Sequence, residues 1–292
     1  MERRAWYIPY SFRGQTGARS SRCASTARLR HSCRGDSGHH LAVASIPRKR
    51  ILVPALLLSL VALLVAEGIA AFRGDGSPEA PGSPDEVVGP ASGASLLFVV
   101  LGDSTGSGVG AVTQDLGYPR RCARALAERT GRRVQLRDFA VSGARVTDVA
   151  QDQLPRMRGL HPDLVLLVIG GNDVTHLTSP FAVRRDLGSV LDTLAVTGAP
   201  VVVSGVPAMG TATRLLQPLR FLTGTIAAFL YDPIWRDETA RRSMHRVDLA
   251  DRTGPAFSRD HSLLAPDGFH PGPRGYEVWA NTFNEVIAKT IS

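Results

Sequence analysis

The sequence predicts an α/β fold, a three-layer αβα sandwich with a five-stranded parallel sheet, within residues 95–292. Short β-rich runs alternate with helical patterns over this segment, as expected for strand–helix–strand units. The runs at 164–169 and 201–203 are apolar without a break, so these strands should be buried on both faces, between two helical layers. The segment is also long enough for one domain with a sizeable core.

The expected elements follow one another in a regular order. We expect strands at 95–101, 134–140, 163–169, 201–206 and, from a weaker pattern, 245–249. We expect helices between them at 119–130, 146–157, 180–197 and 223–244, and a last helix at 275–291. Sheets of this kind bind ligands at the carboxyl ends of their strands, so functional residues are expected there.

The charge of the chain is concentrated at its N-terminus. Residues 1–50 hold eleven basic and two acidic side chains and show no apolar periodicity, which predicts a disordered, Arg-rich cytoplasmic tail. The whole chain has a formal net charge of +8, yet basic and acidic residues are equal in number from residue 73 onward. The predicted domain therefore lacks the excess of basic residues that nucleic-acid binding requires, and we expect no nucleic-acid partner.

Residues 51–72 form a long apolar run that follows the basic cluster Arg48-Lys49-Arg50. A helix of this length rises about 33 Å, against roughly 30 Å for the hydrocarbon core of a bilayer, so the run predicts a transmembrane helix or signal anchor. The basic cluster places residues 1–50 in the cytoplasm and the C-terminal domain outside. A cleaved secretory signal, which would leave the domain secreted, and a buried core helix are the alternatives. Residues 73–94 are rich in Gly, Pro and Ser and predict a flexible linker.

The sequence offers no pattern for a metal site or a disulfide framework. Its three cysteines, Cys23, Cys33 and Cys122, form no Cys-x-x-Cys pair and no cluster with histidine. We therefore expect no metal and no cofactor.

Polar and glycine-rich blocks follow the first three expected strands, at 102–106, 141–144 and 170–173, and a fourth block lies at 267–271. Ser104 stands in a tight turn after the first strand, where it can act as a nucleophile once a base takes its proton. His270 is the candidate base, and Asp267, three residues earlier, can hold the imidazole tautomer. The backbone N–H groups of Ser104 and Gly143 and the side-chain amide of Asn172 are candidate donors to a tetrahedral oxyanion.

These four blocks, in this order, resemble those of the SGNH hydrolases, also called the GDSL esterase/lipase family. The resemblance implies a flavodoxin-like sheet and assigns the same roles to Ser104, Asp267, His270, Gly143 and Asn172. It extends over the expected domain and over none of residues 1–94. One position departs from the pattern, because Thr105 follows the nucleophile where the family has Leu.

Two competing motifs overlap the first block. Residues 102–106 match Gly-x-Ser-x-Gly, the nucleophile turn of α/β-hydrolases, but that fold needs several strands before the nucleophile and the chain has no room for them. Residues 106–111 match a dinucleotide-binding pattern, but an acidic ribose-binding residue is missing at the required distance.

We therefore predict an extracytoplasmic serine esterase, monomeric in its catalytic domain, that cleaves lipid or carbohydrate acyl esters through an acyl-enzyme. An acyltransferase with the same triad and a catalytically silent lipid- or glycan-binding domain are the alternatives. The apolar stretch 207–235 suits either an acyl-binding wall or lid or a core helix, and its helical spacing favours the core.

Overall fold

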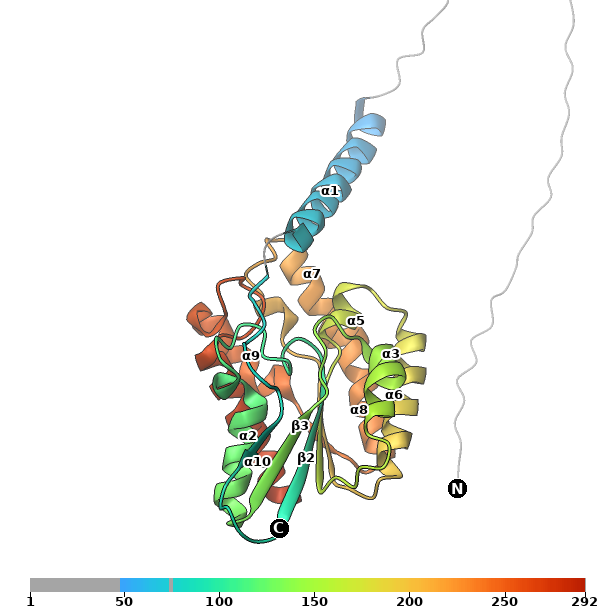
Figure 1. The fold of residues 1–292 in the computed structure, drawn as a ribbon. Helices are drawn as coiled ribbons and strands as arrows, with labels where there is room; N and C mark the ends of the chain where they lie inside the picture. Colours follow the sequence, from blue (N-terminus) through green and yellow to red (C-terminus); the bar gives the residue numbers. More distant parts are fainter. Residues whose placement is uncertain (1–47, 74–75, 292) are drawn as a thin grey trace, which may run out of the picture. The chain divides into compact units, whose positions relative to one another are not determined.

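The computed structural model describes residues 48–73 and 76–291. In this part of the chain six strands form one sheet, in the order β1-β3-β2-β4-β5-β6 (Figure 1). They are β1 Glu86–Val88, β2 Ser95–Gly102, β3 Arg133–Asp138, β4 Leu164–Val168, β5 Val201–Ser204 and β6 His245–Val247. Strands β2 to β6 are parallel and follow the flavodoxin-like order, which confirms the predicted fold class.

Strand β1 is a correction to the predicted five strands and to the linker predicted over 73–94. It pairs antiparallel with β3 at the edge of the sheet. The segment before it is also attached to the domain, because Ala80 is buried and Asp85 Oδ1 accepts the N–H of Asp138 at 3.0 Å. These partners are distant in sequence, so the local composition could not indicate them. Residues of the predicted linker thus contact the sheet before residue 95.

Helices cover both faces of the sheet (Figure 1). One layer contains α2 Tyr118–Thr130, α9 Leu249–Arg259 and α10 Pro273–Thr290. The other contains α3 Val146–Asp148, α4 Leu154–Arg156, α6 Pro180–Ala195 and α8 Asp232–Arg241. Alternate side chains of β2 enter the two cores: Phe98 packs in the cluster with Tyr118, and Val99 packs in the cluster with Trp235. Burial on both faces explains the unbroken apolar runs of the central strands.

Two of the predicted helices are each interrupted by a π-helical turn. The turn Val149–Gln153 separates α3 from α4, and the turn Ala227–Tyr231 separates α7, Leu219–Ile226, from α8. A proline follows each turn by two residues, Pro155 and Pro233. Since proline has no N–H for the α-helical hydrogen bond, the chain widens locally instead of continuing as a regular α-helix.

Several shorter elements and one helix were not predicted. Helix α9 contains Gly254 and Pro255, which weaken a helical signal in the sequence. The remaining elements are α5 Gly171–Thr175 and the 3₁₀ turns Gln114–Leu116, Met209–Thr211 and His261–Leu263. The turn at Met209–Thr211 and α5 both lie beside the predicted site.

Helix α1, Arg48–Arg73, covers the predicted membrane segment. Its stretch Leu52–Ala70 is 19 residues long with a mean hydropathy of 2.4, which is long and apolar enough to cross a membrane. Among the described residues it is the one helix with these properties. The predicted cytoplasmic tail lies outside the described residues except for its last three positions.

Candidate active site

The structure brings Ser104, His270 and Asp267 into one hydrogen-bonded line. Ser104 follows β2, and the other two lie on the loop before α10. Ser104 Oγ lies 2.9 Å from His270 Nε2, and His270 Nδ1 lies 2.7 Å from Asp267 Oδ2. A carboxylate can only accept a hydrogen bond, so it holds the imidazole proton on Nδ1 and leaves Nε2 to accept the serine hydroxyl proton.

Asp267 is held by three backbone donors as well as by the imidazole. Its Oδ1 accepts the N–H groups of Phe269 and His270 at 2.9 and 3.0 Å, and its Oδ2 accepts the N–H of Ser77 at 3.0 Å. Burial by itself raises the pKa of this carboxyl, but the hydrogen bond from His270 and those from the backbone outweigh burial and hold the pKa well below its ordinary value. Asp267 is therefore ionised at neutral pH although its side chain is only 1 % exposed.

Ser77 is a site residue that was not predicted from the sequence. It lies 190 positions before Asp267, in the segment predicted as linker, and contributes through its backbone N–H. No residue type marks a backbone donor, so the sequence contains no signal for it.

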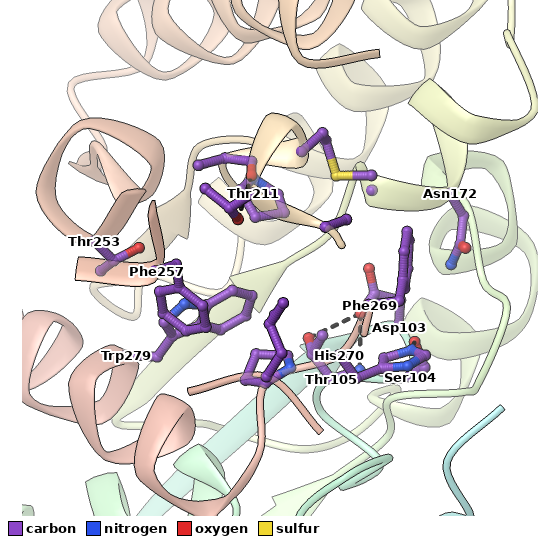
Figure 2. A pocket seen from close by; sticks show the side chains of 17 residues that line it. Asp103, Ser104, Thr105, Asn172, Thr211, Thr253, Phe257, Phe269, His270 and Trp279 are labelled. Atoms are coloured by element: carbon purple, nitrogen blue, oxygen red, sulfur yellow. Dashed lines mark hydrogen bonds between the residues drawn. The ribbon is translucent and has the colours of Figure 1, made fainter. Parts of the chain in front are cut away.

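The turn that carries Ser104 is fixed by its neighbours. Asp103 Oδ1 accepts the N–H and the hydroxyl of Thr105 at 3.0 and 2.8 Å (Figure 2). Burial raises the pKa of Asp103, and the hydrogen bonds from Thr105 oppose that rise. Thr105, the departure from the family pattern, is thus bonded to the residue before the nucleophile. At Gly106 a Cβ would lie 2.4 Å from the Cβ of Ala140, so only glycine fits there.

The candidate oxyanion donors lie around Ser104. Gly143 has φ +82°, a conformation that glycine adopts without strain. Within residues 76–291, neither the N–H of Ser104 nor that of Gly143 has an acceptor. Asn172 Nδ2 donates to Ala144 O at 2.9 Å, which fixes the orientation of the amide and leaves its second proton for another acceptor. Asn172 lines the same pocket as Ser104 and His270 (Figure 2).

A second buried acid, Asp173, holds the loop that contains Gly143. Asp173 Oδ2 accepts the N–H of Val146 at 3.1 Å, which links α5 to the start of α3 just after Gly143. Burial raises the pKa of Asp173 to about 6. The Gly143 loop is therefore attached to α5 through Asp173 as well as through Asn172.

Two cavities of different character meet at Ser104 and His270. The smaller one has a volume of about 60 Å³ and is closed by apolar side chains that include Met209, Phe257 and Trp279 (Figure 2). The larger one opens on the other side and passes between α5 and α7. In the domain it is lined mainly by aliphatic side chains: Leu177, Leu215, Leu219, Leu222 and Ile226.

The stretch 207–235, whose spacing favours a core helix, divides into two parts. Ala227, Tyr231 and Trp235 are buried in the core, as expected. Phe221 and Phe229 are instead 71 % and 81 % exposed, and Leu222 lines the larger cavity. The core interpretation is therefore wrong for α7, which has no fully buried residue, and holds for the residues that follow it.

Within the described part of the chain, no group of three or more His, Cys, Asp or Glu side chains is placed to hold a metal ion. Cys122 is buried in the core, where burial raises the pKa of its thiol well above the ordinary value. The site as described consists of protein groups suited to acyl transfer through serine.

Comparison with known proteins agrees with this geometry. A model of the GDSL-like lipase/acylhydrolase family matches residues 100–278. A GDSL-like esterase of Mycobacterium tuberculosis is 31% identical over 189 residues, which are 63% of this chain and 59% of the relative. The chain thus covers less than two thirds of that relative's length.

Solved structures share the fold. LAE5, an α/β hydrolase enzyme from the metagenome of Lake Arreo, is 25% identical with a TM-score of 0.52, over 68% of this chain and 97% of that one. TesA is 17% identical with a TM-score of 0.54, over 67% and 99% of the two chains. The acetyl xylan esterase AlAXEase is 17% identical with a TM-score of 0.54, over 66% and 100%. The chain belongs to the GDSL-like lipase/acylhydrolase family.

Proposed function

We propose that this protein is a membrane-tethered serine esterase that works outside the cytoplasm and hydrolyses carboxylic esters through an acyl-enzyme. The observation that carries the proposal is the line from Ser104 Oγ through the His270 ring to Asp267, with distances of 2.9 and 2.7 Å. A catalytically silent binding domain would have no need for a buried, ionised carboxylate aligned with a histidine and a serine.

The mechanism follows from the geometry of the triad. Ser104 Oγ attacks the ester carbonyl carbon while His270 Nε2 takes the hydroxyl proton, and Asp267 stabilises the imidazolium that forms. The negative oxygen of the tetrahedral intermediate accepts hydrogen bonds from the N–H groups of Ser104 and Gly143 and from Asn172 Nδ2. The bond to the alcohol oxygen then breaks, and that oxygen takes the proton from His270.

Deacylation repeats these steps with water. His270 takes a proton from the water, whose oxygen attacks the acyl carbon, and the bond to Ser104 Oγ breaks as His270 returns the proton to it. An acceptor alcohol in the place of water would give acyl transfer by the same route.

The location of the domain rests on α1 and the charges around it. Arg48, Lys49 and Arg50 precede the apolar stretch, and this asymmetry favours a cytoplasmic N-terminus and an external domain. Alkaline phosphatase fused after residue 292 should be active if the domain is exported. An inactive fusion at residue 292 that is expressed at the same level would contradict the export of the domain.

The activity is tested with soluble p-nitrophenyl esters from acetyl to decanoyl. The wild-type protein should release p-nitrophenol, and Ser104→Ala should lose this activity while keeping its thermal unfolding transition. Equal activity in Ser104→Ala would remove the proposed nucleophile.

A further inference from the structure

An apolar surface borders the mouth of the active site. It is formed by exposed side chains of α7, the residues just before it and the π turn after it, and we refer to it as the apolar crest: Leu216, Phe221, Leu222, Phe229 and Leu230. Two phenylalanines with exposed fractions of 71 % and 81 % are unusual on the surface of a monomeric domain.

The apolar crest is continuous with the larger cavity beside Ser104. Leu222 belongs to both, and Leu219 and Ile226 of α7 line the cavity. Leu177, at the opposite rim, is also exposed. Figure 1 shows α7 and α5 at the same end of the domain, where the parallel strands end. An apolar path therefore leads from the exposed phenylalanines to the nucleophile.

The length of the chain between α1 and the domain limits which face of the domain can approach a membrane. Helix α1 ends at Arg73, and only residues 74–75 separate it from Gly76. Four Cα–Cα steps lead from Arg73 to Ser77, which is at most about 15 Å whatever their path. Ser77 in turn donates its N–H to Asp267 of the triad.

The distance from Arg73 to Ser77 is short compared with the diameter of the domain. A domain of some 200 residues has a radius of gyration of about 16 Å, which corresponds to a diameter of roughly 40 Å. The chain enters the domain at the active-site end, so its far face cannot reach a membrane that α1 crosses. The face that carries the apolar crest is the one held close to the bilayer.

The chemistry of the crest suits a lipid surface. Residues 210–231 contain two arginines, Arg214 and Arg220, and no acidic residue, although the domain as a whole has no net charge. Aromatic and aliphatic side chains with nearby arginines are typical of helices that lie in the interface of a bilayer with anionic lipids.

We propose that the apolar crest inserts into the leaflet of the membrane that α1 crosses, on the side of the catalytic domain, and so opens the larger cavity directly to acyl esters in that leaflet. The proposal rests on the proposed function, both for the tether through α1 and for the hydrolysis of esters at Ser104. It assigns the bilayer, rather than a second copy of the chain or another protein, as the partner of the crest.

The direct test measures depth of insertion in proteoliposomes that contain the full chain and phosphatidylcholine with 20% phosphatidylglycerol. Phe229→Trp places a fluorophore on the crest, and Val196→Trp places one at an equally exposed position, 87 % exposed, at the C-terminal end of α6. Tryptophan emission is measured in ordinary and in brominated phosphatidylcholine. The emission of the parent chain, which has three tryptophans, is subtracted in each case.

Brominated lipid should quench the added emission of Phe229→Trp and leave that of Val196→Trp unchanged. Quenching at neither position, which is also the result expected if a second copy covers the crest, would overturn the proposal. Quenching at both would mean that no particular face is inserted, and would overturn it too.

A kinetic test separates the crest from the catalytic site. In the same proteoliposomes, Phe221→Ser with Phe229→Ser should hydrolyse a vesicle-embedded long-chain ester about tenfold more slowly, because two large apolar side chains no longer enter the leaflet. The rate of this double variant on soluble p-nitrophenyl acetate and its labelling by a fluorophosphonate should equal those of the parent chain. The control Val196→Ser should equal the parent chain in its rate on the embedded ester and in its rate on p-nitrophenyl acetate. An unchanged rate on the embedded ester would refute the docking, whereas loss of labelling in the parent chain would instead refute the serine esterase.

Discussion

The two sides of Ser104 differ in how firmly their residues are held. The triad side is held by many hydrogen bonds. Asp267 accepts four of them, and side-chain hydrogen bonds of Asp103 and Asn172 fix the turns beside Ser104. The α7 side is held mainly by apolar contacts, and much of its apolar surface faces outward. Groups that must stabilise a charged transition state need fixed positions, whereas a surface that receives acyl chains needs apolar area. Substitutions on the triad side should therefore alter the rate of catalysis, and substitutions on the α7 side should alter substrate preference.

The largest expected effect is on the triad side. His270→Ala removes the base that activates Ser104, so kcat on a soluble ester should fall by roughly 10⁴–10⁶. The matched control is His261→Ala, because His261 lies in a nearby turn outside the triad and should leave kcat within about twofold of wild type. A modest fall in His270→Ala would mean that another group activates the serine.

Asn172→Ala should reduce kcat by about 10²–10³ with little change in KM, since the amide acts on charge that develops only in the transition state. The hydrogen bond from Asn172 Nδ2 to Ala144 O is lost as well, so the melting temperature is measured alongside the rate. A normal rate in a folded variant would exclude Asn172 from the oxyanion site.

Ser77 provides a matched pair of variants. Ser77→Pro deletes the N–H that Asp267 accepts and should lower kcat about tenfold, the expected loss for one hydrogen bond to a charged group. Ser77→Ala keeps the N–H and should behave as wild type. Equal rates for the two variants would show that the N–H of Ser77 does not position the triad.

The same pair has a pH signature. Because the pKa of Asp267 lies below its ordinary value in the folded protein, its ionised form contributes stability above pH 4 that is lost as the pH falls through the folded-state pKa. Ser77→Pro raises that pKa toward its ordinary value, so acid unfolding should begin at a higher pH than in Ser77→Ala. Coincident acid-unfolding curves would contradict this role.

Asp138 should affect stability but not rate. Burial raises its pKa to about 8, so the folded protein keeps this carboxyl protonated where the unfolded chain ionises it near 3.9. Its contribution to stability is present below pH 4 and is lost as the pH rises toward 8. Asp138→Asn should therefore melt at a higher temperature than wild type at pH 8, with kcat unchanged. A lower melting temperature at pH 8 would contradict the buried, protonated carboxyl.

The sequence predicted the parts of the molecule that depend on local patterns. Strands β2, β4 and β5 are apolar runs, and β3 alternates apolar and polar side chains. Ser104, Gly143 and Asn172 lie in the loops that follow β2, β3 and β4, so their meeting at one edge of the sheet follows from parallel topology. The pairing of Asp267 with His270 depends on a spacing of three residues, which is also visible in the sequence.

The parts that the sequence did not predict depend on distant contacts or on backbone groups. Strand β1 consists of three residues in a Gly/Pro/Ser-rich segment and forms only against β3. Ser77 acts through its N–H, which every residue other than proline has. Phe221 and Phe229 are exposed although their spacing fits one apolar helix face, and an apolar period of 3.6 residues does not tell whether that face is covered by the rest of the chain.

The role of Ser104 as the nucleophile is tested most directly by trapping the acyl-enzyme and finding the residue that carries the acyl group. The full chain is treated with a fluorophosphonate or a slowly deacylated ester, digested, and analysed by mass spectrometry. We expect one adduct, on the peptide that contains Ser104; it should be absent in Ser104→Ala and form much more slowly in His270→Ala. An adduct on another residue, or ester turnover that persists in Ser104→Ala, would contradict this role of Ser104.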